Sequence, residues 1–235
     1  MKIALLGYGK MGQAIEKIAK ERGHEIEVKV TSKNSKFDIT KAEVAIDFSL
    51  PKVAYENISK CIKNNVPVIS GTTGWLARYE EVVALCKQHE SAFIYASNFS
   101  LGVNLFFELN KKLAKLMSGY EMYETSITEI HHTQKLDAPS GTAITLAKPI
   151  LENFNKEKWV LGVTKNKKEL PIIAERVDEV PGTHQIKYTS TIDEIEIKHT
   201  AKNRTGFALG AVIAAEWLQD KKGVYTMQDV LGIKK

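Results

Sequence analysis

A glycine-rich turn near the start of the chain constrains the fold more than any other feature. Gly7, Gly9 and Gly12 form a G-x-G-x-x-G pattern that follows an apolar strand pattern and opens a helical one. In such a unit the first glycine permits a tight turn, the second lets a pyrophosphate approach the backbone, and the third allows the helix to pack closely on the strand. A chance glycine-rich turn is the alternative, but strand, spacing and helix all agree. The pattern therefore predicts a dinucleotide-binding unit.

The rest of the first hundred residues repeats this order of strand and helix. Apolar β-type runs predict strands at residues 3–6, 26–30, 44–46, 66–69 and 93–95, and helical patterns lie near residues 11–22, 52–64 and 75–88. Continuous apolar strands separated by helices are typical of a parallel sheet that is covered on both faces. We therefore expect an α/β fold that begins with a doubly wound, Rossmann-type domain.

After residue 104 the pattern changes to a helix at 105–117 followed by strands with few helices between them. Residues 193–199 alternate, with Ile195, Ile197 and His199 on one face, and residues 121–131 and 184–192 also read as strands. Such alternation is typical of an antiparallel sheet. We expect residues 105–204 to form an α+β domain with a mostly antiparallel sheet, in which the lysine-rich residues 156–168 are an exposed loop. Residues 1–104 and 205–235 would form the dinucleotide-binding domain, to which the apolar helix 207–218 returns.

The end of the second expected strand bears on the choice of dinucleotide. The ribose 2′-hydroxyl of NAD is usually held by an acidic residue about twenty positions after the glycine loop. Thr31, Ser32 and Lys33 occupy this place, and the nearest acidic residues lie inside the strand pattern. Two hydroxyls and a lysine, with Lys10 in the glycine loop, suit a 2′-phosphate better. NADPH is therefore the favoured cofactor, with NADH as the alternative.

Polar segments follow three of the other expected strands. Residues 47–49 (DFS), 71–74 (GTTG) and 96–100 (ASNFS) each come directly after an apolar run. Ligands bind at the carboxyl ends of strands in open α/β sheets. Short polar segments at these places can also be plain turns. The residues alone leave both interpretations open.

Residues 131–143, with the sequence HHTQKLDAPSGTA, combine acid/base side chains, cations and a helix start. Histidine titrates near neutral pH, lysine is cationic, and a Pro-Ser-Gly-Thr turn before a helix presents backbone N–H groups to a carboxylate. The alternative is structural, with Ser140 as a helix N-cap, Asp137 in a turn, and the histidines at a strand end. The density of chemical groups favours a site for a small acidic substrate.

Composition limits the partners and the compartment. The net charge of +5 could indicate a nucleic-acid partner, but the lysines are dispersed and no basic stripe alternates with aromatic residues. An acidic small molecule and a phosphorylated cofactor account for the charge. No apolar run is long enough to span a bilayer, and no signal-peptide pattern precedes the first strand. We expect a cytoplasmic protein with neither a nucleic-acid nor a membrane partner.

The chain resembles the dihydrodipicolinate (4-hydroxy-tetrahydrodipicolinate) reductase family over essentially its full length. The signature E-[IV]-x-E-x-H-x-x-x-K-x-D-x-P-S-G-T-A is matched from Ile127 onward, with Ser126 in place of the first glutamate. Residues 47–49, 71–74, 98–104 and 225–231 extend the resemblance. The glycine loop departs from the G-x-x-G-x-x-G of many members. Thr133 and Gln134 stand where many bacterial members have Arg-His, which lowers the cationic charge near the substrate.

The resemblance implies an NAD(P)H-dependent oxidoreductase that reduces 4-hydroxy-tetrahydrodipicolinate to tetrahydrodipicolinate in diaminopimelate and lysine biosynthesis, as a homotetramer assembled through the second-domain sheets. His131 would act as acid/base and Lys135 as proton donor, and His132, Gly141 and Thr142 would bind the cyclic dicarboxylate. Arg204, in a loop, is a further candidate for one carboxylate. The implied cofactor contacts are Gly7, Tyr8, Gly9, Lys10, Met11, Gly12, Gly71, Thr72, Thr73, Ala96, Ser97, Asn98 and Phe99, besides the rim residues Thr31, Ser32 and Lys33.

Two other functions fit parts of the sequence. A related two-domain NAD(P)-dependent dehydrogenase of another substrate would share the scaffold, but such relatives lack D-x-P-S-G-T at this place. A dinucleotide-sensing module without catalysis could dispense with His131 and Lys135, and both are present. No metal site is expected, because adjacent strand residues point to opposite faces and His131 and His132 cannot both reach one ion.

Overall fold

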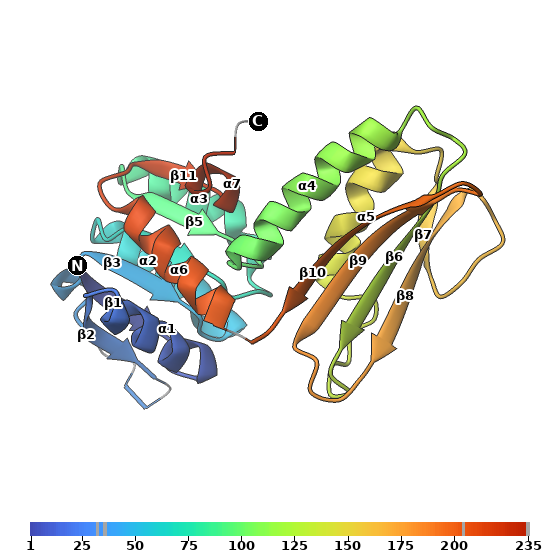
Figure 1. Ribbon diagram of the computed structural model, residues 1–235. Helices are drawn as coiled ribbons and strands as arrows, with labels where there is room; N and C mark the ends of the chain where they lie inside the picture. The colour runs from blue at the N-terminus through green and yellow to red at the C-terminus, as the bar shows by residue number, and fades with distance from the viewer. Residues whose placement is uncertain (32, 35–36, 204, 234–235) are drawn as a thin grey trace. The chain divides into compact units, whose positions relative to one another are not determined.

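The computed structural model describes residues 1–31, 33–34, 37–203 and 205–233 and divides the chain into two compact units (Figure 1). The first unit comprises Met1–Leu101 and Thr205–Lys235, and the second comprises Gly102–Arg204. In the described part of the chain, no helix is both long and apolar enough to cross a membrane.

The first unit contains a six-stranded sheet in which every pairing is parallel. Its strands are β1 (Lys2–Leu6), β2 (Glu25–Val30), β3 (Val44–Asp47), β4 (Val68–Ser70), β5 (Ala92–Tyr95) and β11 (Gly223–Tyr225). The order across the sheet is β11-β5-β4-β3-β1-β2, so the chain adds β2 on one side of β1 and then β3, β4, β5 and β11 on the other side. This confirms the predicted doubly wound sheet, to which β11 adds a strand that the sequence did not reveal.

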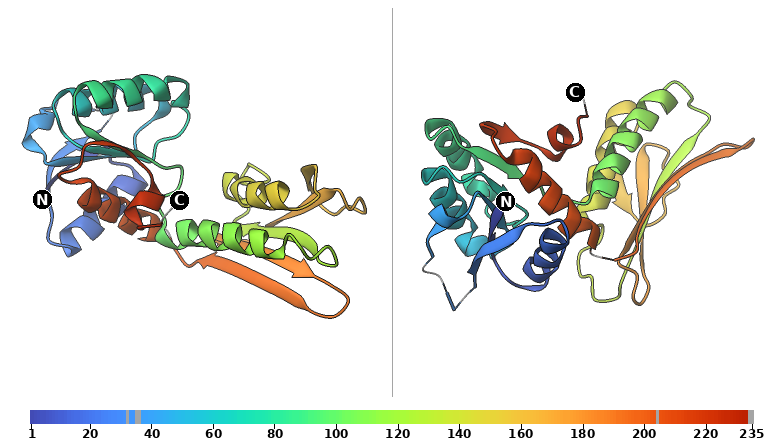
Figure 2. Two further views of the ribbon diagram at one scale, coloured as in Figure 1. Left: turned by 90° about the horizontal axis from the view of Figure 1, so that it is seen from above. Right: turned by 60° about the vertical axis from the view of Figure 1, so that its left-hand side comes forward.

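Helices cover both faces of this sheet (Figure 2). The main ones are α1 (Lys10–Glu21), α2 (Pro51–Lys63), α3 (Tyr79–Gln88) and α6 (Thr205–Leu218), and the short ones are η1 (Ile39–Lys41), η2 (Leu76–Arg78) and α7 (Met227–Val230). Ile3 and Leu5 of β1 face the layer of α1 and α6, whereas Ala4 and Leu6 face the layer of α2 and α3. The apolar helix α6 therefore packs within the first unit.

The predicted helix over residues 75–88 was wrong at its start, because Leu76–Arg78 form a 3₁₀ turn and the α-helix begins at Tyr79. Trp75 is buried, and its indole N–H donates to the carbonyl oxygen of Thr72 at 2.8 Å. Packing of this ring against Tyr79 and Phe93 fixes Trp75 outside the helix.

The second unit packs two helices on one face of a five-stranded sheet. The helices are α4 (Leu101–Met117) and α5 (Gly141–Asn153), and the strands are β6 (Glu124–His131), β7 (Lys158–Leu161), β8 (Glu169–Arg176), β9 (Gly182–Thr189) and β10 (Glu194–Ala201). The order is β10-β9-β6-β8-β7. The α/β and α+β combination that we predicted is thus present.

The second sheet is mixed, because β9 pairs antiparallel with β6 and β10 whereas β8 pairs parallel with β6 and β7. The antiparallel strands β6, β9 and β10 include the segments in which apolar and polar residues alternate in the sequence. The expected loop at residues 156–168 was wrong, because it contains β7. Trp159 packs on the core and pairs with Leu170 of β8, and these contacts override the lysine-rich composition.

Candidate active site

The glycine loop of the first unit connects β1 to α1 in the tight geometry that the sequence predicts. Gly7 has a φ of +97°, and a Cβ atom there would lie 2.1 Å from the carbonyl oxygen of Phe48. A Cβ at Gly12 would lie 2.3 Å from the carbonyl oxygen of Gly7, so helix and loop are in close contact. A Cβ at Gly9 would meet nothing within 4 Å. Gly9 is the N-cap of α1 and makes no side-chain capping bond, which leaves the helix N-terminus open to an anion.

Two adjoining hollows open from this loop. The larger, of about 640 Å³, is lined by Gly7, Tyr8, Gly9, Val30, Thr31, Phe37, Phe48, Ser49, Leu50, Lys52, Val53 and Asn57. The smaller, of about 370 Å³, is lined by Gly9, Lys10, Met11, Phe48, Ser49, Pro51, Gly71, Thr72 and Thr73. The structure therefore brings the glycine loop together with Thr31 and with residues 71–73. Among the described residues of the larger hollow, Lys52 alone carries a charge.

Several expected cofactor residues lie away from these hollows. Lys33 lines neither of them, and its backbone N–H donates to Oγ1 of Thr31 at 3.2 Å. Phe99 is a core residue with 1% exposure, and its ring lies 5.8 Å from that of Phe48. Ala96, Ser97 and Asn98 follow β5 without lining either hollow. Ser32 lies outside the described residues.

Asp47, at the end of β3, ties the loops behind these hollows together. Its carboxylate is fully buried and accepts hydrogen bonds from Oγ of Ser49 (2.6 Å), Oγ of Ser70 (2.8 Å) and Oγ1 of Thr72 (2.7 Å). Thr72 in turn accepts a bond from the backbone N–H of Ser49. Burial raises the pKa of Asp47, and the hydroxyl donors offset this only in part. The loops after β3 and β4 thus share one anchor.

In the second unit, the period-two pattern of β6 places Glu129 and His131 on the buried face of the sheet. Strand register supplies their neighbours, because Glu129 pairs with His184 of β9 and His131 pairs with Arg176 of β8. Paired residues point to the same face of a sheet. Four titratable side chains from three strands therefore meet at one place beneath α5.

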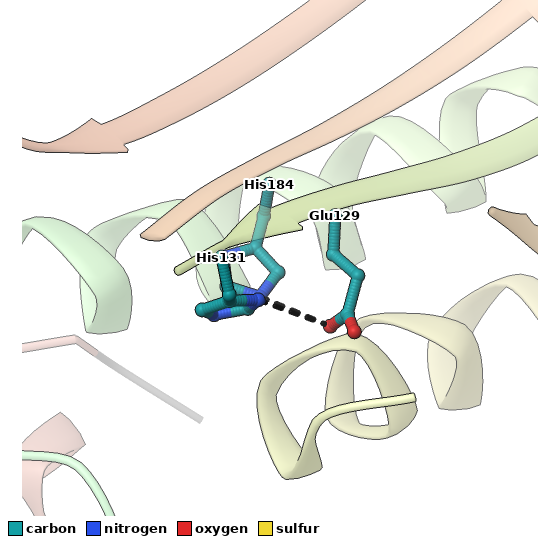
Figure 3. A group of neighbouring side chains, drawn as sticks. All are labelled: Glu129, His131 and His184. Atoms are coloured by element: carbon teal, nitrogen blue, oxygen red, sulfur yellow. Dashed lines mark ion pairs between the residues drawn. The ribbon is translucent and has the colours of Figure 1, made fainter. Parts of the chain in front are cut away.

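Glu129 is the centre of this cluster. Its carboxylate lies 3.8 Å from Nδ1 of His131 and 3.7 Å from Nε2 of His184 (Figure 3). Nη2 of Arg176 donates to Oε1 of Glu129 at 3.3 Å, and the backbone N–H of Ser140 lies within 3.2 Å of both carboxylate oxygens. The two imidazole rings are 5.0 Å apart in an edge-to-face arrangement.

These contacts set the charges of the cluster. Burial opposes the ionisation of Glu129, yet His184 and Ser140 outweigh it, so the pKa of the carboxyl is lowered to about 2. Burial and the repulsion of His184 lower the pKa of His131 to about 4, although Glu129 acts in the opposite direction. The charges of Lys135 and Arg176 also lower it. At neutral pH, Glu129 is therefore ionised and His131 is neutral.

Lys135 lies in the turn that follows β6. Its ammonium group contacts both carboxylate oxygens of Asp137 at 2.7 and 2.8 Å, and its side chain is 21% exposed. The ion pair with Lys135 lowers the pKa of Asp137. The cation is thus held at the surface of the cluster by a partner that is itself accessible.

The segment then enters α5 with an open helix start. Ser140 is the N-cap, and its hydroxyl accepts a bond from the backbone N–H of Ala143 at 3.2 Å. The same hydroxyl lies 3.2 Å from Nε2 of His184. A Cβ at Gly141 would meet nothing within 4 Å. The first N–H groups of α5, at Gly141 and Thr142, are therefore available to a carboxylate.

His132 is not part of this cluster. It lines a separate hollow of about 550 Å³ together with Thr133, Gln134, Asp178, Glu179, Val180, Pro181 and Asn203. The opposite directions of His131 and His132 follow from strand alternation, as expected. Two of the lining side chains are acidic. Arg204 lies outside the described residues.

The cluster also has the composition of a metal site. The ligand atoms of Glu129, His131 and His184 lie within 4.8 Å of one another, a grouping that does not include His132. However, Ser140 and Arg176 already occupy the carboxylate, and a guanidinium beside a dication is unfavourable. We interpret the cluster as a hydrogen-bonded charge network.

Sequence reasoning assigned no role to Glu129, Arg176 or His184 of this network. Glu129 could have been found, because it lies two residues before His131 on the same strand face. Arg176 and His184 reach the site only through strand pairing. In the first unit, Lys52 and Asn57 of α2 were likewise missed, and the helix start after β3 was the available signal.

Comparison with known proteins identifies the family. The family model for the C-terminal part of dihydrodipicolinate reductase matches residues 102–231, and that for the N-terminal part matches residues 25–99. A 4-hydroxy-tetrahydrodipicolinate reductase from Christiangramia forsetii is 59% identical over 98% of both chains. One from Methanoregula boonei is 34% identical over 90% of this chain and 80% of its own.

Solved structures share the fold. The dipicolinate-bound dihydrodipicolinate reductase from Paenisporosarcina sp. TG-14 superposes with a TM-score of 0.78 and 24% identity over 97% of this chain and 98% of its own. An amine dehydrogenase from Mycobacterium smegmatis reaches a TM-score of 0.59 at 8% identity over 97% of this chain and 95% of its own. The predicted resemblance, fold and enzyme class are confirmed, and the first unit is a dinucleotide-binding domain. The chain belongs to the dihydrodipicolinate reductase family.

Proposed function

We propose that this protein catalyses the NAD(P)H-dependent reduction of 4-hydroxy-tetrahydrodipicolinate to tetrahydrodipicolinate, a step of diaminopimelate and lysine biosynthesis. Family membership supports this reaction, since the relative at 59% identity over nearly the whole chain carries that name. Within the molecule, one observation carries the proposal. Lys135, neutral His131 and the open start of α5 are joined by one hydrogen-bonded segment at the end of β6.

The start of α5 is the proposed binding site for one carboxylate of the substrate. The N–H groups of Gly141 and Thr142 point out of the helix end, where the macrodipole favours an anion. The hydroxyl of Thr142 can add a third donor. The hydroxyl of Ser140 is already engaged by Ala143, so it positions the turn. The family resemblance gives two candidates for the other carboxylate, His132, which lines the separate hollow, and Arg204, which lies outside the described residues.

Lys135 is the proposed proton donor. Its ammonium group is bound to Asp137, an exposed partner that a substrate carboxylate can replace at small cost. Electron density that builds up on the ring during reduction needs a nearby cation and a proton, and a lysine supplies both. His131 is neutral at neutral pH, so its ring can hydrogen-bond the reacting segment or accept a proton.

The first unit is suited to a dinucleotide. The open position at Gly9, the uncapped start of α1 and the hollow of about 640 Å³ fit the pyrophosphate and the adenosine part. Gly7–Gly12 and residues 71–73 would contact the cofactor, with residues 96–99 at the end of β5. When bound, NAD(P)H supplies the hydride of the reduction.

We propose that NADPH is preferred over NADH. The hollow beside Thr31 contains no acidic side chain among its described residues, and it contains Lys52. A ribose 2′-hydroxyl would therefore find no carboxylate there, whereas a 2′-phosphate would find a cation. Lys10 and Lys33 are further candidates near the same rim.

We also propose a cytoplasmic homotetramer assembled through the sheet of the second unit. Exposed apolar side chains of the sheet include Leu161 of β7 and Ile195 of β10, and others lie on α4, at Leu105, Leu109 and Leu116. Exposed apolar surface of this kind is typical of an interface. Light scattering coupled to size-exclusion chromatography should give four times the mass of the chain, and a monomer would contradict this part of the proposal.

The reaction is tested by following NADPH absorbance after addition of freshly generated dihydrodipicolinate synthase product. We expect consumption by the natural protein and strongly reduced consumption by Lys135→Met. A dehydrogenase of another substrate would bind NADPH but ignore this product while oxidising NADPH with another carbonyl or imine compound. A sensing module would bind NADPH and consume it with neither.

A further inference from the structure

Arg176, the last residue of β8, directs its guanidinium group at the segment that follows β6. Nε donates to the carbonyl oxygen of Lys135 at 3.2 Å, and Nη2 donates to the carbonyl oxygen of Asp137 at 2.6 Å. Nη2 also reaches Oε1 of Glu129 at 3.3 Å. One side chain thus contacts the backbone on both sides of Leu136 and the centre of the buried cluster.

The segment between β6 and α5 has few other side-chain contacts, and the one at its start is an exposed hydrogen bond from Oγ1 of Thr133 to Asp178 at 2.6 Å. None of residues 132–138 is buried, and Leu136 is 97% exposed, so no apolar side chain anchors the turn. The backbone N–H of Lys135 donates to the carbonyl oxygen of His132 at 3.1 Å, which closes the turn locally. Arg176 connects this turn to the sheet.

Glu129 extends the connection to α5. It is fully buried, and its two oxygens face the backbone N–H of Ser140, the residue that caps the helix. The ion pair between Arg176 and Glu129 therefore lies between the Lys135 turn and the helix start. Both ends of the segment are fixed to the same pair of charges.

We infer that Arg176 is a positioning residue, which holds the Lys135 turn in register with the carboxylate-binding start of α5. This inference rests on the proposed function for its catalytic meaning. Arg176 itself acts through the backbone of residues 135–137 and through Glu129. A lysine keeps the charge but lacks the planar fork that serves several acceptors at once.

The first test compares Arg176→Lys with Arg78→Lys as a matched control. Arg78 also makes a two-bond ion pair, with Glu81 at 2.9 and 2.8 Å, but on the surface of the first unit. We expect Arg176→Lys to lower kcat about 10–100-fold, because a small displacement of a catalytic group has an effect of this size. The KM for the dicarboxylate should change less than about threefold, since Ser140 keeps its own contact with Glu129. Arg78→Lys should retain normal kcat.

Chemical rescue separates positioning from general damage. In Arg176→Ala, added guanidinium ion should restore part of kcat, whereas an equal concentration of ammonium ion should not, because only the planar ion can serve the vacated acceptors. Normal kcat in Arg176→Lys, an equal loss in Arg78→Lys, or equal rescue by both ions would overturn the inference.

Amide hydrogen exchange tests the positioning without any turnover. The N–H groups of Lys135 and Ser140 should exchange at least about tenfold faster in Arg176→Lys than in Arg78→Lys, because their segment opens locally. Unchanged protection would overturn the inference. If the natural protein consumed no NADPH with the synthase product, the proposed reaction would fail, and hydrogen exchange would still decide whether Arg176 holds this segment.

Discussion

Two fully buried carboxylates, one in each unit, have pKa values that are shifted in opposite directions. Asp47 is surrounded by the hydroxyl groups of Ser49, Ser70 and Thr72, and burial raises its pKa. Glu129 is equally buried, but a guanidinium, two imidazoles and a backbone N–H surround it, and its pKa is lowered to about 2. Burial acts in the same direction on both acids, and the neighbouring groups decide whether the pKa ends above or below its ordinary value.

The difference matches what each unit is built to do. The first unit shapes a hollow with backbone atoms, glycines and mostly uncharged side chains, which suits the binding of a large cofactor. The second unit concentrates ionised groups around a short segment, which suits proton transfer to a small dicarboxylate. Changes of charge should therefore be severe in the second unit and mild in the first.

The largest effect is expected at Lys135. Lys135→Met should lower kcat roughly 10²–10⁴-fold, the usual contribution of a positioned proton donor. Affinity for NADPH should not change, because the glycine loop belongs to the first unit. His131→Gln should behave similarly, and His132→Gln should have a smaller effect because His132 lines a separate hollow with two acidic residues. Steady-state kinetics with calorimetry of NADPH binding checks this, and near-normal turnover in Lys135→Met would rule out its role.

The second prediction compares the two buried acids by substitution. Glu129→Gln should lower the free energy of unfolding by about 2–4 kcal/mol, somewhat less than for a fully buried ion pair because Arg176 is 22% exposed. Asp47→Asn should cost less than about 1 kcal/mol, since its neutral hydroxyl partners can reorient. Urea titrations of the two variants provide the measurement. Equal losses would show that the charge of Glu129 does not matter to stability.

The two acids should also affect the free energy of unfolding in different ranges of pH. The contribution of Glu129 to the free energy of unfolding is fully present above its ordinary pKa of 4.5. It is lost as the pH falls towards its folded pKa of about 2. The contribution of Asp47 is complete below its ordinary value of 3.8 and declines as pH rises through its raised folded pKa. In Glu129→Gln, the free energy of unfolding should therefore vary less with pH below pH 4.5. In Asp47→Asn, it should vary less with pH above pH 3.8. The same change in both variants would contradict the assigned directions.

A smaller effect is expected at Thr142, at the start of α5, where backbone N–H groups are proposed to bind a substrate carboxylate. Thr142→Val should raise KM for the dicarboxylate by an amount equivalent to about 1.5–3 kcal/mol, because one hydroxyl donor to a charged group is lost. Turnover at saturating substrate should stay nearly normal. Pyridine-2,6-dicarboxylate should compete with the substrate, and its affinity should fall in parallel. No competition by this planar dicarboxylate would argue against a paired carboxylate site.

The smallest effect is expected at the cofactor rim. NADPH should bind more tightly than NADH by on the order of 1–2 kcal/mol, a margin that salt reduces because the lysines are accessible. Lys52→Ala should remove more of this margin than Lys33→Ala, because Lys52 lines the hollow and Lys33 does not. Isothermal titration with both cofactors at two salt concentrations measures the margin. An NADH preference that persists in Lys10→Ala, Lys33→Ala and Lys52→Ala variants would show that this rim does not select the cofactor.

Features that depend on neighbours in sequence were predictable. The glycine loop, the cap at Ser140 and the alternation that buries Glu129 and His131 all arise within a few residues, where backbone geometry and side-chain spacing dominate. The same local rules predicted the order of strands and helices from β1 to β5 in the first unit, although they missed β11. They failed at the lysine-rich β7 and at Trp75, where packing against distant residues outweighs composition.

Features that depend on pairing between distant strands could not be predicted. Arg176 reaches Glu129 because β8 lies parallel beside β6, and His184 reaches it because β9 lies antiparallel on the other side. Asp47 gathers hydroxyl groups from loops that follow two different strands. Residues that are far apart in the chain carry no mutual signal in one sequence, and the low polarity of the interior gives their contacts a large effect on charge. The sequence by itself therefore determined which types of residue are present in the site. The tertiary structure decided which partners they contact, and these partners set their pKa values.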